Sequence, residues 1–207
     1  MSNKKIFLSL TFSTLCIISM AQISVPSMDF QLKAGVATLI DVRDSYENSY
    51  SYTSPTLYGE LNWNITQHVS VGAFGSKGIY STSNYKVNYS SGDASYGGTH
   101  SLYGLKLRLS TGRAPRFRPF AEINYGKMQM VMERDTYRLA NSTNFFGLSM
   151  GLMIRGGSRL YIVLPQINLR FRSNGFFFEA HNDYLFSSYG PFAEVCAGLS
   201  YNFGKKK

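Results

Sequence analysis

The stretch TNFFGLSMGLMIR (residues 143–155) decides the fold, because its side chains alternate with a period of two. Every even position from Phe146 to Ile154 is apolar, whereas the odd positions include Gly147, Ser149 and Gly151. Side chains point to opposite faces of a strand in turn, so this pattern predicts a β-strand with one apolar face and one small or polar face.

The same alternation recurs along the chain, as in PFAEVCAGLSYNF (residues 191–203). No segment after Gln22 shows sustained helical spacing. Six further strands are predicted at 30–40, 57–65, 69–80, 102–110, 119–131 and 160–172. Most of the eight are longer than the roughly five or six residues usual in soluble sheets, and they approach the ~9–11 residues of a membrane-crossing strand.

The connections between these strands alternate between short and long. Short ones are expected at 66–68, 111–118 and 156–159, and long polar ones at 41–56, 81–101, 132–142 and 173–190. Outer-membrane barrels have short periplasmic turns and long extracellular loops. The sequence therefore predicts an all-β fold, a transmembrane up-and-down antiparallel barrel of eight strands, with ten strands as the alternative.

The N-terminus predicts export. Two lysines in residues 1–5 precede the apolar stretch Ile6–Met20, which ends at the small-residue site Ser19-Met20-Ala21. This is the chemistry of a cleaved signal peptide, so we expect a signal at residues 1–21 and an outer-membrane barrel domain at 22–207. Cys16 would leave with the signal, and Cys196 alone cannot form an intramolecular disulfide.

The net charge of +9 does not indicate nucleic-acid binding, because the basic residues are dispersed apart from a short tail at 205–207. A soluble lipocalin-like barrel is the structural rival, and it would turn its apolar face inward. Glycines on the non-apolar face and aromatic residues near the strand ends favour the membrane barrel.

Two motifs carry a family resemblance: RPFAEINYG (residues 118–126) and the ending GLSYNFG (residues 198–204), together with the signal followed by Gln22. The chain resembles the porin-like outer-membrane β-barrel family common in Bacteroidota. The resemblance implies an eight-stranded meander like the OmpA and OmpX barrels, with no catalytic residue and no substrate. Residues 176–186 are also strand-like, and we interpret them as an ordered part of the last long loop.

If the apolar face points outward, several charged residues point into the barrel. We predict a lumen charge network of Lys33, Glu60, Lys106, Arg108, Glu122, Arg155, Arg170 and Glu194. An eight-stranded barrel has room only for its own side chains, so these charges are expected to pair. A structural plug is the favoured interpretation, and an ion path is the alternative.

The sequence offers few candidate catalytic or metal-binding residues. His100 and His181 could meet at the outer rim beside Ser101, as in a lipid-modifying enzyme, and Glu179, His181 and Asp183 alternate as potential metal ligands. Neither set has the spacing of a defined site. We therefore expect no catalysis, no metal and no cofactor.

The extracellular loops are the better candidates for a binding surface. They carry Tyr46, Tyr50, Tyr52, Tyr85, Tyr89 and Tyr96 amid small polar residues, a composition typical of binding loops. Basic residues near the outer ends, including Lys86, Arg134, Arg138 and Arg172, are candidates for lipopolysaccharide contact. The predicted role is that of a monomeric structural or surface-interaction protein of the outer membrane. A narrow pore for small solutes is the first alternative and a lipid-modifying enzyme the second.

Overall fold

The computed structural model describes residues 27–44, 49–81, 87–89, 92–94, 97–111, 116–134, 137–174, 176–180, 183–188 and 191–203. For the strand ends nearest the long loops, only the backbone is described. The predicted signal peptide lies outside these residues, and so does Cys16. In the part of the chain that the structure describes, no helix is both long and apolar enough to cross a membrane.

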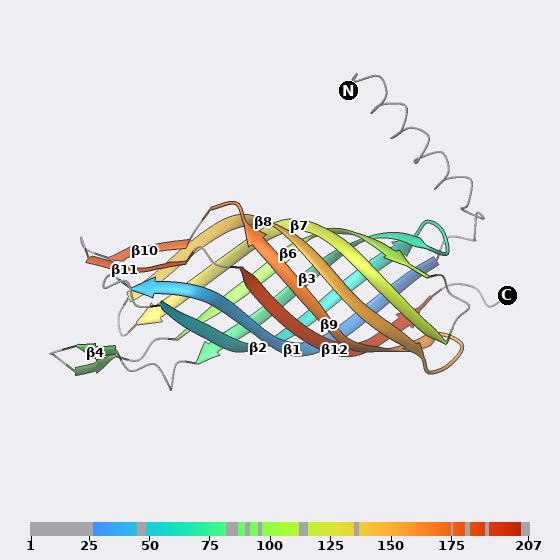
Figure 1. Ribbon diagram of the computed structural model, residues 1–207, viewed down its shortest axis with the longest axis horizontal. Helices are drawn as coiled ribbons and strands as arrows, with labels where there is room; N and C mark the ends of the chain where they lie inside the picture. The colour runs from blue at the N-terminus through green and yellow to red at the C-terminus, as the bar shows by residue number, and fades with distance from the viewer. Residues whose placement is uncertain are drawn as a thin grey trace, which may run out of the picture.

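Eight long strands close into a barrel (Figure 1). They are β1 (Ser27–Asp44), β2 (Ser49–Asn64), β3 (Val69–Ser81), β6 (Gly97–Ser110), β7 (Phe117–Arg134), β8 (Tyr137–Arg155), β9 (Leu160–Arg172) and β12 (Phe192–Asn202). Each pairs antiparallel with its neighbour, and β1 pairs with both β2 and β12. Closure leaves no open edge within the wall, as a membrane-spanning sheet requires.

The predicted eight-stranded fold is confirmed, and the long loops explain the other strands. The short hairpin β4 (Val87–Tyr89) and β5 (Gly92–Ala94) lies in the loop between β3 and β6. Strands β10 (Phe176–Ala180) and β11 (Asp183–Ser188) form a hairpin whose β11 pairs only with the far end of β1. Residues 176–180 and 183–186 are therefore an ordered part of the loop, and the ten-stranded alternative is wrong.

Several strands extend beyond their predicted ends on the side of the long loops. β7 and β8, for example, stay paired as far as Arg134 and Tyr137, well past the apolar alternation. Backbone pairing needs no apolar face, so the ladder continues where the side chains have become polar. The barrel wall therefore protrudes beyond its apolar belt toward the long loops.

One strand contains an irregularity that the alternation hides. The pairing of β9 with β12 shifts between Val163 and Gln166, around Leu164 and Pro165. Proline has no N–H to donate to a ladder and is accommodated at a bulge. The bulge changes the parity of β9, so that Tyr161, Val163, Gln166 and then Arg170 all face inward.

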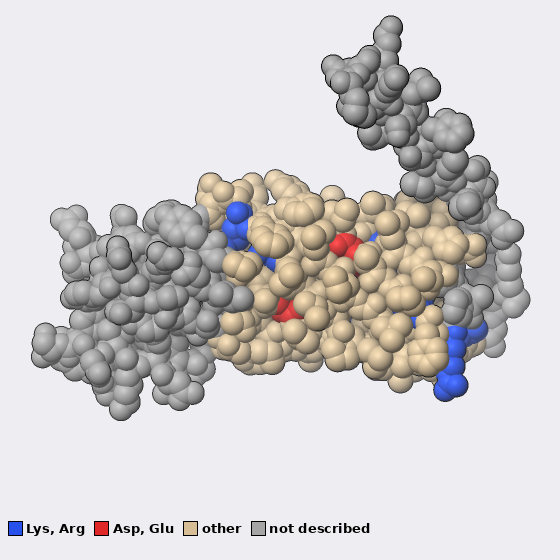
Figure 2. Space-filling view, in the orientation of Figure 1, with Lys and Arg blue, Asp and Glu red and all other residues tan. Residues whose placement is uncertain are grey.

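The outer face is apolar and the interior is polar, the reverse of a soluble barrel. Large side chains such as Leu105 and Met150 are 70% and 63% exposed, and Figure 2 shows a broad belt along the barrel with few charged atoms at its surface. Among the buried residues, 24 polar or charged side chains outnumber 13 hydrophobic ones. In water this arrangement would expose far more apolar surface than a monomer normally carries, so the belt faces lipid.

Candidate functional site in the barrel lumen

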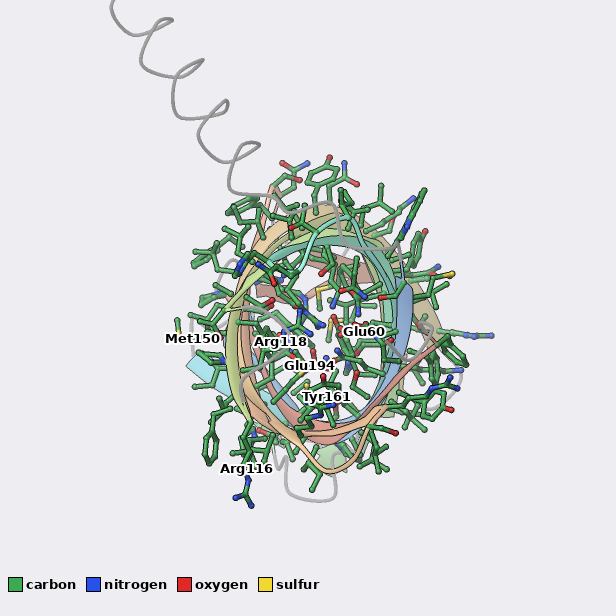
Figure 3. All side chains as sticks on the ribbon, turned by 90° about the vertical axis from the view of Figure 1, so that its right-hand side faces the viewer. Glu60, Arg116, Arg118, Met150, Tyr161 and Glu194 are labelled. Carbon is green, nitrogen blue, oxygen red and sulfur yellow. The ribbon has the colours of Figure 1, made fainter. Side chains whose placement is uncertain are left out.

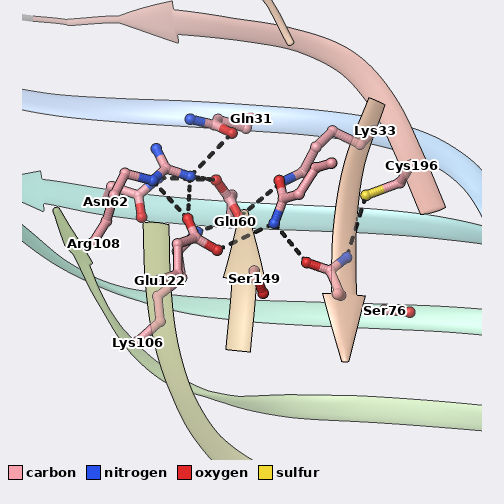
Figure 4. Close-up of polar contacts among 12 residues, drawn as sticks. Gln31, Lys33, Glu60, Asn62, Ser76, Lys106, Arg108, Glu122, Ser149 and Cys196 are labelled. Atoms are coloured by element: carbon pink, nitrogen blue, oxygen red, sulfur yellow. Dashed lines mark hydrogen bonds and ion pairs between the residues drawn. The ribbon is translucent and has the colours of Figure 1, made fainter. Parts of the chain in front are cut away.

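A central charge cluster occupies the middle of the lumen (Figure 4). Lys33 Nζ lies 2.9 Å from Glu60 Oε2, and Lys106 Nζ lies 2.8 Å from Glu122 Oε1. Arg108 donates from Nε to Glu122 Oε1 at 2.6 Å, and both Lys106 and Arg108 also pair with Glu60. The five side chains come from β1, β2, β6 and β7, and at most 1% of any of them is exposed. Each charge is therefore compensated within the barrel wall.

Amide side chains satisfy the rest of this cluster. Gln166 accepts a hydrogen bond from Lys33 Nζ at 2.7 Å and donates to Glu122 Oε2 at 3.1 Å. Asn62 donates to Asp29 at 2.8 Å and to Glu60 at 3.2 Å. Asp29 thus adds a third carboxylate opposite the three cations of the cluster. Buried charges are tolerated when they are paired and hydrogen-bonded, and most of the polar atoms of this cluster are; Arg108 Nη1 and Asn62 Oδ1 have no hydrogen-bond partner among the described residues.

A second ion pair lies nearer the extracellular end. Arg170 Nη1 donates to Glu194 Oε2 at 2.8 Å, and Glu194 also accepts bonds from Ser76 at 2.9 Å and Asn168 at 3.1 Å. Serine, amide and guanidinium come from β3 and β9, while the carboxylate comes from β12. The barrel closure brings these strands around a single carboxylate.

Four aromatic rings surround the guanidinium of Arg170. The rings of Tyr58, Phe74, Phe145 and Phe192 have their centroids 5.7–5.9 Å from its Cζ atom. The Nε and Nη2 atoms of Arg170 have no hydrogen-bond partner among the described residues, so cation–π contacts supply much of their stabilisation. All four rings are buried, so they occupy the interior of the barrel around this guanidinium.

Apolar side chains lie on both sides of the polar interior. Leu102 on β6 and Met128 and Met130 on β7 are buried on the extracellular side. On the periplasmic side, Phe120, Met153, Tyr161 and Val163 form a buried cluster. The charges are thus held between two apolar layers.

Seven of the eight charges predicted to form the lumen network lie inside the barrel. Figure 3, viewed from the periplasmic end, shows Glu60 and Glu194 within the ring of strands and Met150 outside it. Arg155 is the exception, and its predicted lumen position is wrong. It is the last residue of β8, is exposed, and donates from Nε to the carbonyl of Gly157 at 3.1 Å. The alternation of β8 does assign Arg155 to the inward face. The strand ends at this residue, however, so its side chain is exposed to solvent.

Several interior residues escaped the sequence analysis. Asp29 precedes the first predicted strand, although β1 already begins at Ser27. Arg118 lies inside the periplasmic mouth, where it donates to the Ser110 hydroxyl at 2.7 Å. The interior amides carry no charge and therefore gave no signal, although the same alternation places Gln31 and Asn168 on the inner face.

The structure does not place His100 at the exposed outer rim, where it was expected to meet His181 beside Ser101. His100 is buried in the lumen, where its Nδ1 lies 3.4 Å from the Ser54 hydroxyl and its ring contacts Phe192. Ser101, as the next residue of β6, points to the opposite face. His181 lies outside the described residues, and so do the side chains of Glu179 and Asp183. Among the described residues, no three His, Cys, Asp or Glu side chains are grouped to hold a metal.

The tyrosines of the predicted loop surface cannot be placed. Tyr46, Tyr85 and Tyr96 lie outside the described residues, and for Tyr50, Tyr52 and Tyr89 only the backbone is described.

Comparison with known proteins rests on the fold. No protein-family model and no curated protein sequence matches the chain. Neisserial surface protein A matches with a TM-score of 0.58 at 9% identity, covering 86% of this chain and 99% of that one. The outer membrane protein OprG of Pseudomonas aeruginosa matches with a TM-score of 0.55 at 9% identity, covering 86% and 96%. The outer membrane protein AlkL, solved in lipid bilayers, gives 0.51 at 11% identity, covering 90% and 94%.

These neighbours share the eight-stranded architecture. With its inverted surface and closed wall, the chain is an eight-stranded β-barrel of the bacterial outer membrane.

Proposed function

We propose that the protein is a non-catalytic outer-membrane barrel with a plugged lumen and a structural or surface-interaction role, through adhesion or lipopolysaccharide contact. Its motifs at residues 118–126 and 198–204 resemble those of the porin-like barrels of Bacteroidota. The observation that carries the proposal is the charge pairing of the central interior. Three cations oppose three carboxylates in the central cluster, and Arg170 opposes Glu194 above it.

Such an interior opposes conduction. An ion entering the lumen would have to displace side chains that already satisfy one another, and it would meet an apolar layer at either end. The ladder of β7 and β8 supports the surface role, because it holds the loops away from the apolar belt. Loop tyrosines and small polar residues then provide the contact chemistry.

Single-channel recording separates this proposal from a narrow pore. The purified protein in a planar bilayer is expected to show no steady conductance. The double variant Arg170→Ala with Glu194→Ala removes a neutral pair from the level of the four aromatic rings, and we expect it to show small conductance steps. Arg155→Ala, outside the barrel, serves as the matched control and should stay silent. Steady conductance of the unaltered protein would overturn the plug.

The surface role has its own test. Deleting residues 82–96, which removes three of the loop tyrosines, should reduce adhesion of cells that display the protein. The barrel itself should stay folded, because the deletion spares all eight wall strands. Unchanged adhesion with normal surface display would contradict the loop as the contact surface.

A further inference from the structure

The outer wall carries an apolar groove of about 610 Å³ across β2, β3, β6 and β7. It is lined by Leu61, Trp63, Ala73, Leu105, Ile123 and Tyr125, among others. The strand register explains its shape, because the small Ala73 lies directly between Leu61 and Leu105. A methyl group between two leucines leaves a furrow along β3. Its volume is within the roughly 300–1,000 Å³ of small-molecule sites.

A polar platform continues the same strands toward the extracellular end. Lys77 on β3 lies opposite Ser101 on β6, which lies opposite Gln129 on β7. In the adjacent row, Lys127 on β7 lies opposite Asn144 on β8. Lys77 and Lys127 are both exposed on the outer face. The two lysines therefore lie on either side of β6, offset by two residues in register, and they are the charged residues among the described outward side chains of β3, β6 and β7.

No carboxylate with a described side chain competes for these lysines on the outer surface. Asp29, Glu60, Glu122 and Glu194 are the acids in that part of the chain, and all four are buried in the lumen. An exposed cation pair without an acidic neighbour favours an anionic ligand, and a lysine ammonium binds phosphate as a point charge.

The groove reaches the platform on β7, and from there it runs toward the periplasmic ends of β2 and β3, where Trp63 and Val71 line it. Tyr125 lines the groove, and Lys127 follows it by two residues on the same face of β7. Tyr103, 52% exposed, lies opposite Lys127 and marks the aromatic boundary of the belt. The long loops leave the barrel from this end, so the platform lies at the headgroup level of the outer leaflet.

We propose that this face binds lipopolysaccharide through its phosphorylated glycolipid anchor. An acyl chain lies in the groove, Lys77 and Lys127 bind a phosphate, and Ser101, Gln129 and Asn144 donate hydrogen bonds to the sugar. The inference rests on the proposed surface-interaction role and gives it a partner. Phosphate and acyl chain must be present together, because each half of the site matches one part of that lipid.

The test uses the folded full-length barrel in nanodiscs of neutral phosphatidylcholine. Native mass spectrometry measures binding of purified lipid A and of the same lipid after removal of its phosphates. We expect Lys77→Ala with Lys127→Ala to weaken lipid A binding by about tenfold for each lysine, as loss of a charge-assisted hydrogen bond predicts. Lys77→Arg with Lys127→Arg should restore it. Ala73→Phe, which fills the groove, should also weaken it.

Arg116→Ala is the matched control, since Arg116 is an exposed cation at the periplasmic end (Figure 3). It should bind lipid A as the unaltered protein does. Inorganic phosphate should fail to compete, which distinguishes the lipid from a free anion. Equal binding by the double alanine variant, or equal binding of the dephosphorylated lipid, would overturn the site. Channel recording is independent of these results, so a failure here leaves the plugged lumen standing.

Discussion

The substitution Glu60→Gln tests the central charge cluster most directly. Glu60 is fully buried and pairs with Lys33, Lys106 and Arg108. Glutamine keeps the volume and one carbonyl acceptor, but it turns an NH₂ group toward three cations. The central cluster then holds one uncompensated positive charge in a region that water does not reach.

Removing one partner of a buried ion pair costs about 3–5 kcal/mol of unfolding free energy, because the other charge stays buried. We expect Glu60→Gln to fall in this range rather than near the ~1 kcal/mol of an ordinary neutral hydrogen bond. The protein is a favourable object for the measurement. Its single tryptophan, Trp63, is 57% exposed on the outer face, so its fluorescence reports transfer from lipid to water. Guanidinium unfolding in lipid bilayers then yields the free energy.

Arg155→Gln provides the matched control. The alternation assigns Arg155 to the inner face, as it does Glu60, but the structure shows that Arg155 is exposed. Removing its charge should therefore change the free energy of unfolding by no more than about 0.5 kcal/mol. Glu60→Gln combined with Lys106→Met removes opposite charges together and should recover part of the loss. A loss below about 1 kcal/mol for Glu60→Gln would refute the reasoning, because the three cations would then have to be stabilised by something other than Glu60.

Three further outcomes are expected. Gly104→Val should prevent barrel formation, because a Cβ at Gly104 would lie 2.3 Å from the Tyr125 carbonyl oxygen; the readout is loss of the heat-dependent shift in gel mobility. Gly59→Val is the control and should fold, since nothing lies within 4 Å of its Cβ position. Arg170→Gln should destabilise the barrel by about 3–5 kcal/mol in the same unfolding assay by leaving Glu194 unpaired, and a near-neutral result would contradict the ion pair. Deleting the hairpin β10–β11 should leave the folded barrel intact by the gel assay, since that hairpin pairs only with the end of β1; failure to fold would make it part of the wall.

The sequence by itself determined the fold and the two faces of the wall. Burial in a barrel follows the period of two in the side chains, so alternation alone assigns Leu148 to lipid and Glu122 to the lumen. It favoured eight strands but left ten open, because residues 176–186 are also strand-like; the structure decided the count by pairing β11 with β1 beyond the end of β12. The bulge at Pro165 is a local exception: before it the inward residues of β9 are at odd positions, such as Tyr161 and Val163, and after it they are at even positions, such as Arg170.

Only the tertiary structure decided which interior groups meet and where the interior ends. Alternation gives a face but no register, and the pairing of Lys33 with Gln166 joins residues 133 positions apart in sequence. It also gives no height along the axis, which is why Arg155 was assigned to the lumen although it lies beyond the wall. Strand tilt and closure fix both quantities together, and these are properties of the whole sheet. The inward face was therefore readable from each strand alone, whereas the charge cluster exists only once all eight strands have closed.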